Sequence, residues 1–167
     1  PGGIDVMACS LDEFVARLGA ENHTLKRSLT NPQLFSGIGN AYSDEALHRA
    51  RMSPVTLTRS LDAAAAQRLQ DATRAVMSEW TERLGEEAAK HSGWPPKVTA
   101  FHPQMAVHGR DGQPCPVCGS KVQRIVHGDR APKRAARAAP QRGAAELGAA
   151  LRSANETNYC ARCQTGG

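Results

Sequence analysis

The chain has 167 residues, which suffices for one domain with a small satellite and excludes a large multi-domain enzyme. Hydrophobic residues make up 40% of it but aromatic residues only 4%, so we expect a small and mainly helical core. The formal net charge of +5 arises in residues 101–167, because residues 1–100 are slightly acidic overall.

Residues 1–9 begin with Pro1, Gly2 and Gly3, and we expect them to be a linker. Residues 10–104 are predicted to form a helical domain. Its first helix follows a capping-box sequence that runs from Ser10 to Glu13, and a second helical stretch is predicted over 21–29. No apolar run approaches the roughly 20 residues of a membrane-spanning helix, so we expect a soluble, cytoplasmic protein.

A glycine-rich loop is predicted at residues 36–40, ahead of a third helix that extends to Arg51. Gly37 and Gly39 allow a backbone that points consecutive N–H groups at an anion, while Asn40 is expected to cap the helix. Taken alone, such a loop is more often a plain turn between helices with an asparagine cap. Lys26 and the basic C-terminal third favour a nucleic-acid backbone as the anion, although Lys26 also fits a solvated helix lysine.

The longest periodic run predicts a helix over residues 60–84, with Trp80 as a packing residue. Residues 85–104 carry several prolines and glycines and predict a long loop. A β-hairpin is then predicted from Met105–Arg110 and Lys121–Val126. Residues 127–154 are rich in alanine and arginine and indicate a low-complexity basic insertion within the segment 105–167.

Four of the five cysteines form two Cys-x-x-Cys pairs, Cys115 with Cys118 and Cys160 with Cys163. Each pair can supply two corners of a zinc tetrahedron, and four thiolates leave no open position, so the pattern predicts one structural Zn²⁺. The gap of 41 residues between the pairs exceeds the usual ~15–20, which an insertion explains.

Two alternatives to this zinc site stay open. The cysteines could form disulfides or remain idle thiols. A histidine could also replace one cysteine as a ligand, and the histidines considered for this are His102, His108 and His127.

Lys26 to Pro54, and above all the stretch from Gly37 to Leu47, resembles the helix-two-turn-helix of the formamidopyrimidine-DNA glycosylase and endonuclease VIII family. Residues 107–110, both cysteine pairs and the ending 159–164 resemble that family's C-terminal zinc-finger hairpin. The resemblance covers residues 10–126 and 154–167. It implies a mainly α fold, with a helix-two-turn-helix helical domain followed by a small β-hairpin zinc finger.

The resemblance implies base-excision repair, in which oxidised bases are removed from damaged double-stranded DNA and the abasic strand is nicked by an AP lyase step. In that family an N-terminal β-sandwich domain supplies a proline nucleophile and a glutamate, and nothing in this chain matches it. We therefore expect the C-terminal DNA-binding part of a bifunctional glycosylase and lyase, without a catalytic residue of its own. Pro1 is then an interdomain linker residue exposed by truncation. We also expect a monomer that is associated with the nucleoid when bound to DNA.

The resemblance also implies the DNA-binding residues. Lys26 matches a lysine near the damaged nucleotide, and Asn40 matches a loop asparagine that holds phosphates. Asn155 stands where the family usually has an arginine that grips a phosphate and assists δ-elimination, so efficient δ-elimination is not implied. The full set of expected DNA-binding residues is Lys26, Gly37, Gly39, Asn40, Arg110 and Asn155.

Two rival hypotheses remain. The first is a stand-alone, non-enzymatic zinc protein that binds DNA or RNA through its basic segment. The second is that this chain is itself active through another nucleophile, for which Lys26 is the candidate.

Overall fold

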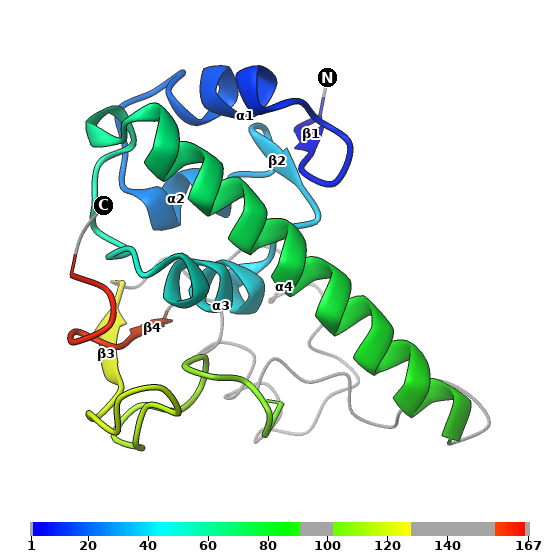
Figure 1. The fold of residues 1–167 in the computed structure, drawn as a ribbon, viewed down its shortest axis with the longest axis vertical. Coiled ribbons are helices and arrows are strands. Elements are labelled where there is room, and N and C mark those ends of the chain that lie inside the picture. Colours follow the sequence, from blue (N-terminus) through cyan, green and yellow to red (C-terminus); the bar gives the residue numbers. More distant parts are fainter. Residues whose placement is uncertain (1, 91–101, 128–155, 166–167) are drawn as a thin grey trace, which may run out of the picture.

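The computed structural model describes residues 2–90, 102–127 and 156–165, and it is mainly α-helical, as the sequence predicts (Figure 1). The helices are α1 (Leu11–Leu18), α2 (Leu25–Leu29), α3 (Asn40–Ala50) and α4 (Ala63–Lys90), with a short 3₁₀ turn at Thr58–Ser60. Strands β1 (Ile4–Asp5) and β2 (Phe35–Ser36) form one parallel pair, and β3 (Gln123–Val126) and β4 (Glu156–Tyr159) form one antiparallel pair. Among the helices of the described residues, none combines the length and apolarity that crossing a membrane requires.

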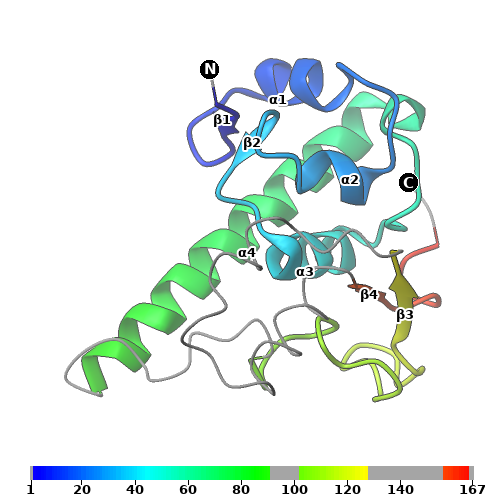
Figure 2. The same cartoon turned by 180° about the vertical axis from the view of Figure 1, so that it is seen from behind.

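The long helix α4 runs diagonally across the molecule and contacts both α1 and α3 (Figure 2). Phe14 of α1, Leu47 of α3 and Leu69 of α4 are fully or almost fully buried in the core between these helices. A smaller cluster beside it contains Trp80, which is 4% exposed, so the predicted packing role of this residue is confirmed.

The N-terminal segment differs from the linker that the sequence suggests. Ile4 pairs with Phe35 between β1 and β2, and Val6 is fully buried in the main core. Arg74 of α4 donates a hydrogen bond to the carbonyl of Val6 at 2.9 Å. Residues 4–9 are therefore an integral part of the helical unit.

The helix boundaries follow local capping groups. The capping box of α1 is confirmed, because the Glu13 amide donates to Ser10 Oγ and the Ser10 amide donates to the Glu13 carboxylate. The second helix begins only at Leu25, later than predicted, because Thr24 caps it. The longest helix begins at Ala63, where Asp62 accepts the Ala65 amide, and it continues past Gly85 to Lys90. An exposed glycine costs a helix only about 1 kcal/mol, so Gly85 does not end it.

The predicted hairpin is wrong in its first strand. Residues 105–110 form no strand, whereas β3 (Gln123–Val126) lies within the predicted second strand and pairs with β4, from Gln123 opposite Tyr159 to Val126 opposite Glu156. The hairpin strands are thus separated in sequence by residues 127–155 and do not flank the turn at Asp111 and Gly112. Of the predicted loop 85–104 and the predicted insertion 127–154, residues 91–101 and 128–154 lie outside the described residues.

Candidate nucleic-acid interface and metal centre

The glycine-rich loop is held in place by one buried side chain. Ile38 is 6% exposed and packs into the main core, while Gly37 and Gly39 on either side of it are exposed. Gly37 has φ +79°, a left-handed conformation that favours glycine. Gly39 has φ −87° and ψ 179°, which any residue can adopt, and a β-carbon built there meets no atom within 4 Å. Neither backbone conformation nor packing among the described residues requires glycine at position 39.

The N-terminus of α3 carries no side-chain cap among the described residues, whereas Ser10 caps α1 and Thr24 caps α2. The prediction that Asn40 caps this helix is wrong. Gly39 occupies the cap position. The side-chain amide of Asn40 instead donates to the backbone carbonyl of Glu156 in β4 at 2.9 Å. The first N–H groups of a helix have no partner within the helix, and the helix dipole favours an anion there. This end of α3 can therefore accept an anion.

Lys26 is buried, so the interpretation of a solvated helix lysine is wrong. Its side chain is 8% exposed, and its ammonium group donates to the Asp44 carboxylate at 2.6 Å, Ser43 Oγ at 2.7 Å and the Asn40 carbonyl at 2.8 Å. These bonds account for all N–H groups of an ammonium ion. Burial lowers the pKa of Lys26 from its usual value, and the neighbouring Asp44 charge opposes this shift. Contact between Lys26 and DNA stays a prediction.

Asp44 and Glu45, which we call the carboxylate pair, connect α3 to three other segments. Asp44 accepts from Lys26 of α2, from His108 Nδ1 at 2.7 Å and from the amide of Asn158 in β4 at 3.1 Å. Glu45 accepts the backbone amides of residues 106–108 at 2.7–2.9 Å. The backbone donors of residues 106–108 are thus satisfied by a helix side chain and not by a neighbouring strand, which explains why this segment forms no strand.

The remaining predicted DNA-binding residues are placed as follows. Arg110 is half-buried and donates from Nη1 to the Met105 carbonyl at 3.3 Å. Its Nε is buried without a hydrogen-bond partner among the described groups. Asn155 lies outside the described residues. Of the predicted DNA-binding residues, Asn40 at the end of the loop 36–40 lies next to β4. The contacts of Arg110 and Asn155 with DNA stay predictions.

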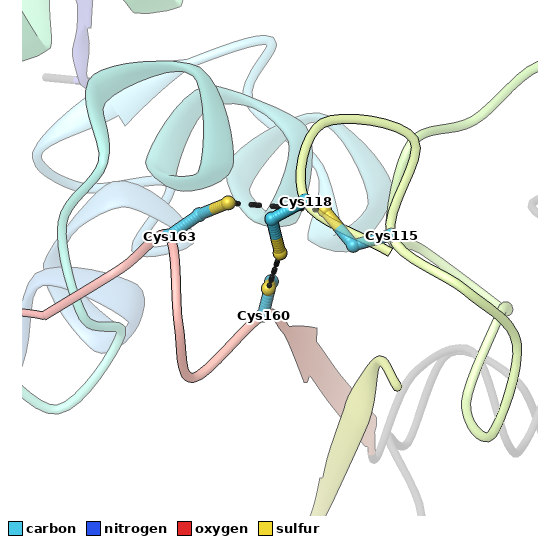
Figure 3. A group of neighbouring side chains, drawn as sticks. All are labelled: Cys115, Cys118, Cys160 and Cys163. Carbon is cyan, nitrogen blue, oxygen red and sulfur yellow. Dashed lines mark hydrogen bonds between the residues drawn. The ribbon is translucent and has the colours of Figure 1, made fainter. Parts of the chain in front are cut away.

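Cys115 and Cys118 lie in the loop that precedes β3, and Cys160 directly follows β4. The side chains of the two pairs point toward one another (Figure 3). The sulfur atoms of Cys115, Cys118, Cys160 and Cys163 all lie within 4.8 Å of one another. The distance from Cys115 to Cys163 is 3.9 Å and that from Cys118 to Cys160 is 3.5 Å. A tetrahedron with zinc–sulfur bonds of 2.3 Å needs sulfur separations of roughly 3.8 Å. The cluster therefore fits a four-thiolate metal ion.

The structure bears on two alternatives to this site, namely disulfide bonds and a histidine ligand. No two sulfurs are near the roughly 2.05 Å of a disulfide bond, and all five cysteines are free. The three histidines considered as ligands have other partners: His102 contacts Glu87, His108 contacts Asp44 and His127 contacts Thr157. Among the described histidines, the one that reaches the cluster is His48 of α3, whose Nε2 lies 3.3 Å from Cys115 Sγ.

Sequence reasoning missed His48 for a physical reason. It lies one helical turn after Asp44, and nothing in the local pattern connects position 48 with position 115. Its side chain is buried, and burial lowers the pKa of His48 below its usual value. The imidazole is therefore neutral near pH 7.

The thiols of the cluster differ in their acidity. Hydrogen bonds from Ser120 lower the pKa of Cys118 to about 6. Burial raises the pKa of Cys160, and it raises that of Cys163 to about 12. Without a metal ion, Cys118 is a thiolate at pH 7, while Cys160 and Cys163 keep their protons.

Comparison with known proteins assigns the helical part to a family. Residues 5–90 match the model of the formamidopyrimidine-DNA glycosylase H2TH domain. An uncharacterized formamidopyrimidine-DNA glycosylase-like protein of Mycobacterium tuberculosis is 31% identical over 166 residues, which cover 99% of this chain and 85% of that protein. The formamidopyrimidine-DNA glycosylase of Thermus thermophilus is 43% identical over 115 residues, which cover 68% of this chain but only 43% of the enzyme.

Solved structures agree with this assignment. The crystal structure of MutM (Fpg) from T. thermophilus matches 99% of this chain and 54% of its own, with a TM-score of 0.69 and 32% identity. The complex of Lactococcus lactis Fpg with DNA that contains an abasic site matches 93% of this chain and 47% of its own, with a TM-score of 0.65. At 21% identity this second match shows a shared fold. The chain thus spans about half the length of these two enzymes.

We predict that Asp44→Asn destabilises the fold by about 3 kcal/mol, because it leaves Lys26 without a countercharge. The new side-chain NH₂ group would also face N–H groups that now donate to Asp44, such as the Asn158 amide. Urea unfolding followed by circular dichroism measures this loss. The matched control is Asp71→Asn on the exposed side of α4, which changes stability by less than about 0.5 kcal/mol. Equal stabilities of the two variants would contradict the structural role of Asp44.

Metal binding should release protons, because the thiolate is the ligand and Cys160 and Cys163 are protonated at pH 7. We predict that zinc binding at pH 7 releases the protons of both residues and that zinc affinity falls as the pH is lowered. Calorimetric titration in buffers of different ionisation enthalpy measures the release. Cys9→Ser, outside the cluster, leaves it unchanged. Zinc affinity that is constant between about pH 6 and pH 8 would refute this prediction.

Proposed function

The chain belongs to the formamidopyrimidine-DNA glycosylase family, and we propose that it is the DNA-holding part of a bifunctional DNA glycosylase and AP lyase of base-excision repair. The observation that carries this proposal is the uncapped N-terminus of α3 behind the exposed Gly39. The proposed partner is damaged double-stranded DNA, bound by a monomer in the compartment that holds the chromosome.

A DNA phosphate fits the N-terminus of α3 for steric and electrostatic reasons. Gly39 leaves the space beside its α-carbon open, so a phosphate can approach the backbone closely, and the first amides of α3 can donate to it. Asn40 fixes this end of the helix to β4 through one N–H of its amide. The buried ammonium of Lys26 contributes by holding the Asn40 carbonyl and Ser43 in place. The L. lactis relative has been crystallised with abasic-site DNA, which supports the same partner here.

The four cysteines would hold one Zn²⁺, and this ion would supply a structural crosslink between the two Cys-x-x-Cys pairs. In this proposal residues 10–104 form the helical domain that binds DNA, with residues 4–9 packed against it. Residues 105–167 form a small zinc finger, and β3 and β4 are its two paired strands. Arg110 and Asn155 are proposed to contact phosphates from the finger side.

No residue of this chain is assigned to catalysis. A lyase nucleophile needs an accessible amine, and the ammonium group of Lys26 is enclosed by Asp44, Ser43 and Asn40. The glycosylase and lyase chemistry is proposed to belong to the part of the relatives that this chain does not match. The match covers only 43% of the T. thermophilus enzyme, so more than half of that enzyme lies outside the matched region.

One observation favours a second candidate function. The M. tuberculosis relative is matched over 85% of its length, so little of that protein lies outside the region shared with this chain. A stand-alone, non-enzymatic zinc protein that binds nucleic acid is therefore the alternative. It shares the DNA and zinc sites and differs in lacking any lyase step.

We predict opposite effects of Gly39→Ser on stability and DNA binding. A serine at the cap position can accept an amide of α3, so the free energy of unfolding stays equal or rises by a few tenths of a kcal/mol. The same side chain occupies the proposed phosphate site, so affinity for an abasic-site duplex falls about tenfold. Fluorescence anisotropy at several salt concentrations measures the affinity, which for the wild type decreases steeply with salt.

The matched control is Gly85→Ala, an exposed substitution within α4 that also stabilises the helix. It leaves DNA affinity unchanged. Loss of DNA binding in Gly85→Ala, or unaltered binding in Gly39→Ser, would contradict the assignment of the phosphate site.

Borohydride trapping on abasic DNA separates the enzyme part from the stand-alone protein. Borohydride reduces an imine between an amine of the protein and the opened sugar, so only a lyase nucleophile becomes crosslinked. We predict no crosslink with this chain alone and a crosslink when the catalytic domain of the T. thermophilus enzyme is fused in front of it. Binding without a crosslink in both proteins would favour the stand-alone alternative, and a crosslink by this chain alone would refute the absence of a nucleophile.

A further inference from the structure

His48 makes a contact that the DNA-binding role of α3 does not need. The Nε2 atom of His48 lies 3.3 Å from Cys115 Sγ, and His48 is 7% exposed. Buried imidazole nitrogens usually have a hydrogen-bond partner, and the sulfur of Cys115 is the partner of this one. His48 is not among the residues whose ligand atoms all lie within 4.8 Å of one another. It is therefore placed next to a ligand and outside the ligand set.

A thiolate that binds a metal ion accepts hydrogen bonds, and a donor beside it fixes its orientation and spreads its charge. Nε2 of His48 can be that donor, since a neutral imidazole carries one N–H. The second cysteine pair is also connected to the region of α3 by hydrogen bonds. Gln164 accepts the Cys160 amide at 2.7 Å and donates to the carbonyl of Met52, just after α3, at 2.9 Å. Both pairs are thereby connected to the C-terminal end of the same helix.

We propose that His48 is a positioning residue of the metal centre, whose Nε2–H donates to the Cys115 thiolate and couples metal binding to the placement of α3. This inference rests on the proposed binding of zinc by the four cysteines. It adds a contact from the helical part to the finger, so that occupation of the metal site stabilises the helix that presents Gly39 and Asn40 at its other end.

The test compares zinc affinities of the full chain and of two His48 variants, measured by competition with a chromophoric chelator. His48→Phe removes the donor, and we expect zinc affinity to fall 10- to 100-fold, the usual effect of losing a hydrogen bond to a metal ligand. His48→Gln keeps an N–H donor at a similar reach, and we expect an affinity within about threefold of the wild type. Val76→Ala, buried in α4 away from the cluster, controls for general loss of stability and leaves zinc affinity unchanged.

Cobalt(II) spectra of the same variants distinguish a donor from a ligand. We expect the absorption of a four-thiolate site in the wild type and in both variants, and a change of the ligand-field bands in His48→Phe would overturn the proposal by making His48 a ligand. Equal zinc affinities of wild type and His48→Phe would overturn it as well. Failure of the wild type to bind zinc or cobalt would instead refute the proposed metal site itself.

A measurement on the unaltered protein covers the case in which His48→Phe does not fold. In ¹⁵N NMR spectra of the zinc-loaded chain, His48 should carry its proton on Nε2. A His48 tautomer protonated on Nδ1 alone would overturn the proposal, because Nε2 would then have no proton to donate.

Discussion

The carboxylate pair at Asp44 and Glu45 is the interaction on which the arrangement of the molecule depends. Both residues are buried, and their oxygens accept from a lysine, a histidine and four backbone amides that belong to three separate segments. Burying two carboxylates is costly, and it is tolerated only when their hydrogen-bonding capacity is satisfied. The segments that satisfy them, α2, residues 105–110 and β4, are consequently fixed around α3.

The two ends of α3 serve different parts of the proposed function. At its N-terminus the helix presents open amides behind Gly39, and Asn40 joins this end to β4. Toward its C-terminus His48 touches Cys115, and Gln164 joins the second cysteine pair to Met52. A DNA phosphate and a structural metal ion would thus lie along one rigid element. In the proposed enzyme, α3 would therefore connect the helix-two-turn-helix physically to the zinc finger.

The features that sequence reasoning predicted are those with short-range causes. The capping box at Ser10, the glycine-rich loop and the two Cys-x-x-Cys pairs each depend on residues a few positions apart, and the structure contains all three. Apart from helix ends, the features it missed depend on contacts over long separations. Residues 105–110 look like a strand until Glu45 takes their amides, and Lys26 looks exposed until Asp44 is known to lie beside it. The partner of β3 was missed because it follows a long insertion.

The N-terminus of α3 is proposed to bind DNA phosphate, and the cysteine cluster is proposed to have a structural role. Amide chemical shifts of the zinc-loaded chain, titrated with an abasic-site duplex, test this proposal most directly. We expect the largest changes at Gly39, Asn40 and Ala41, with small changes at the four cysteines. Changes that leave this end of α3 untouched and gather elsewhere on the chain would contradict it.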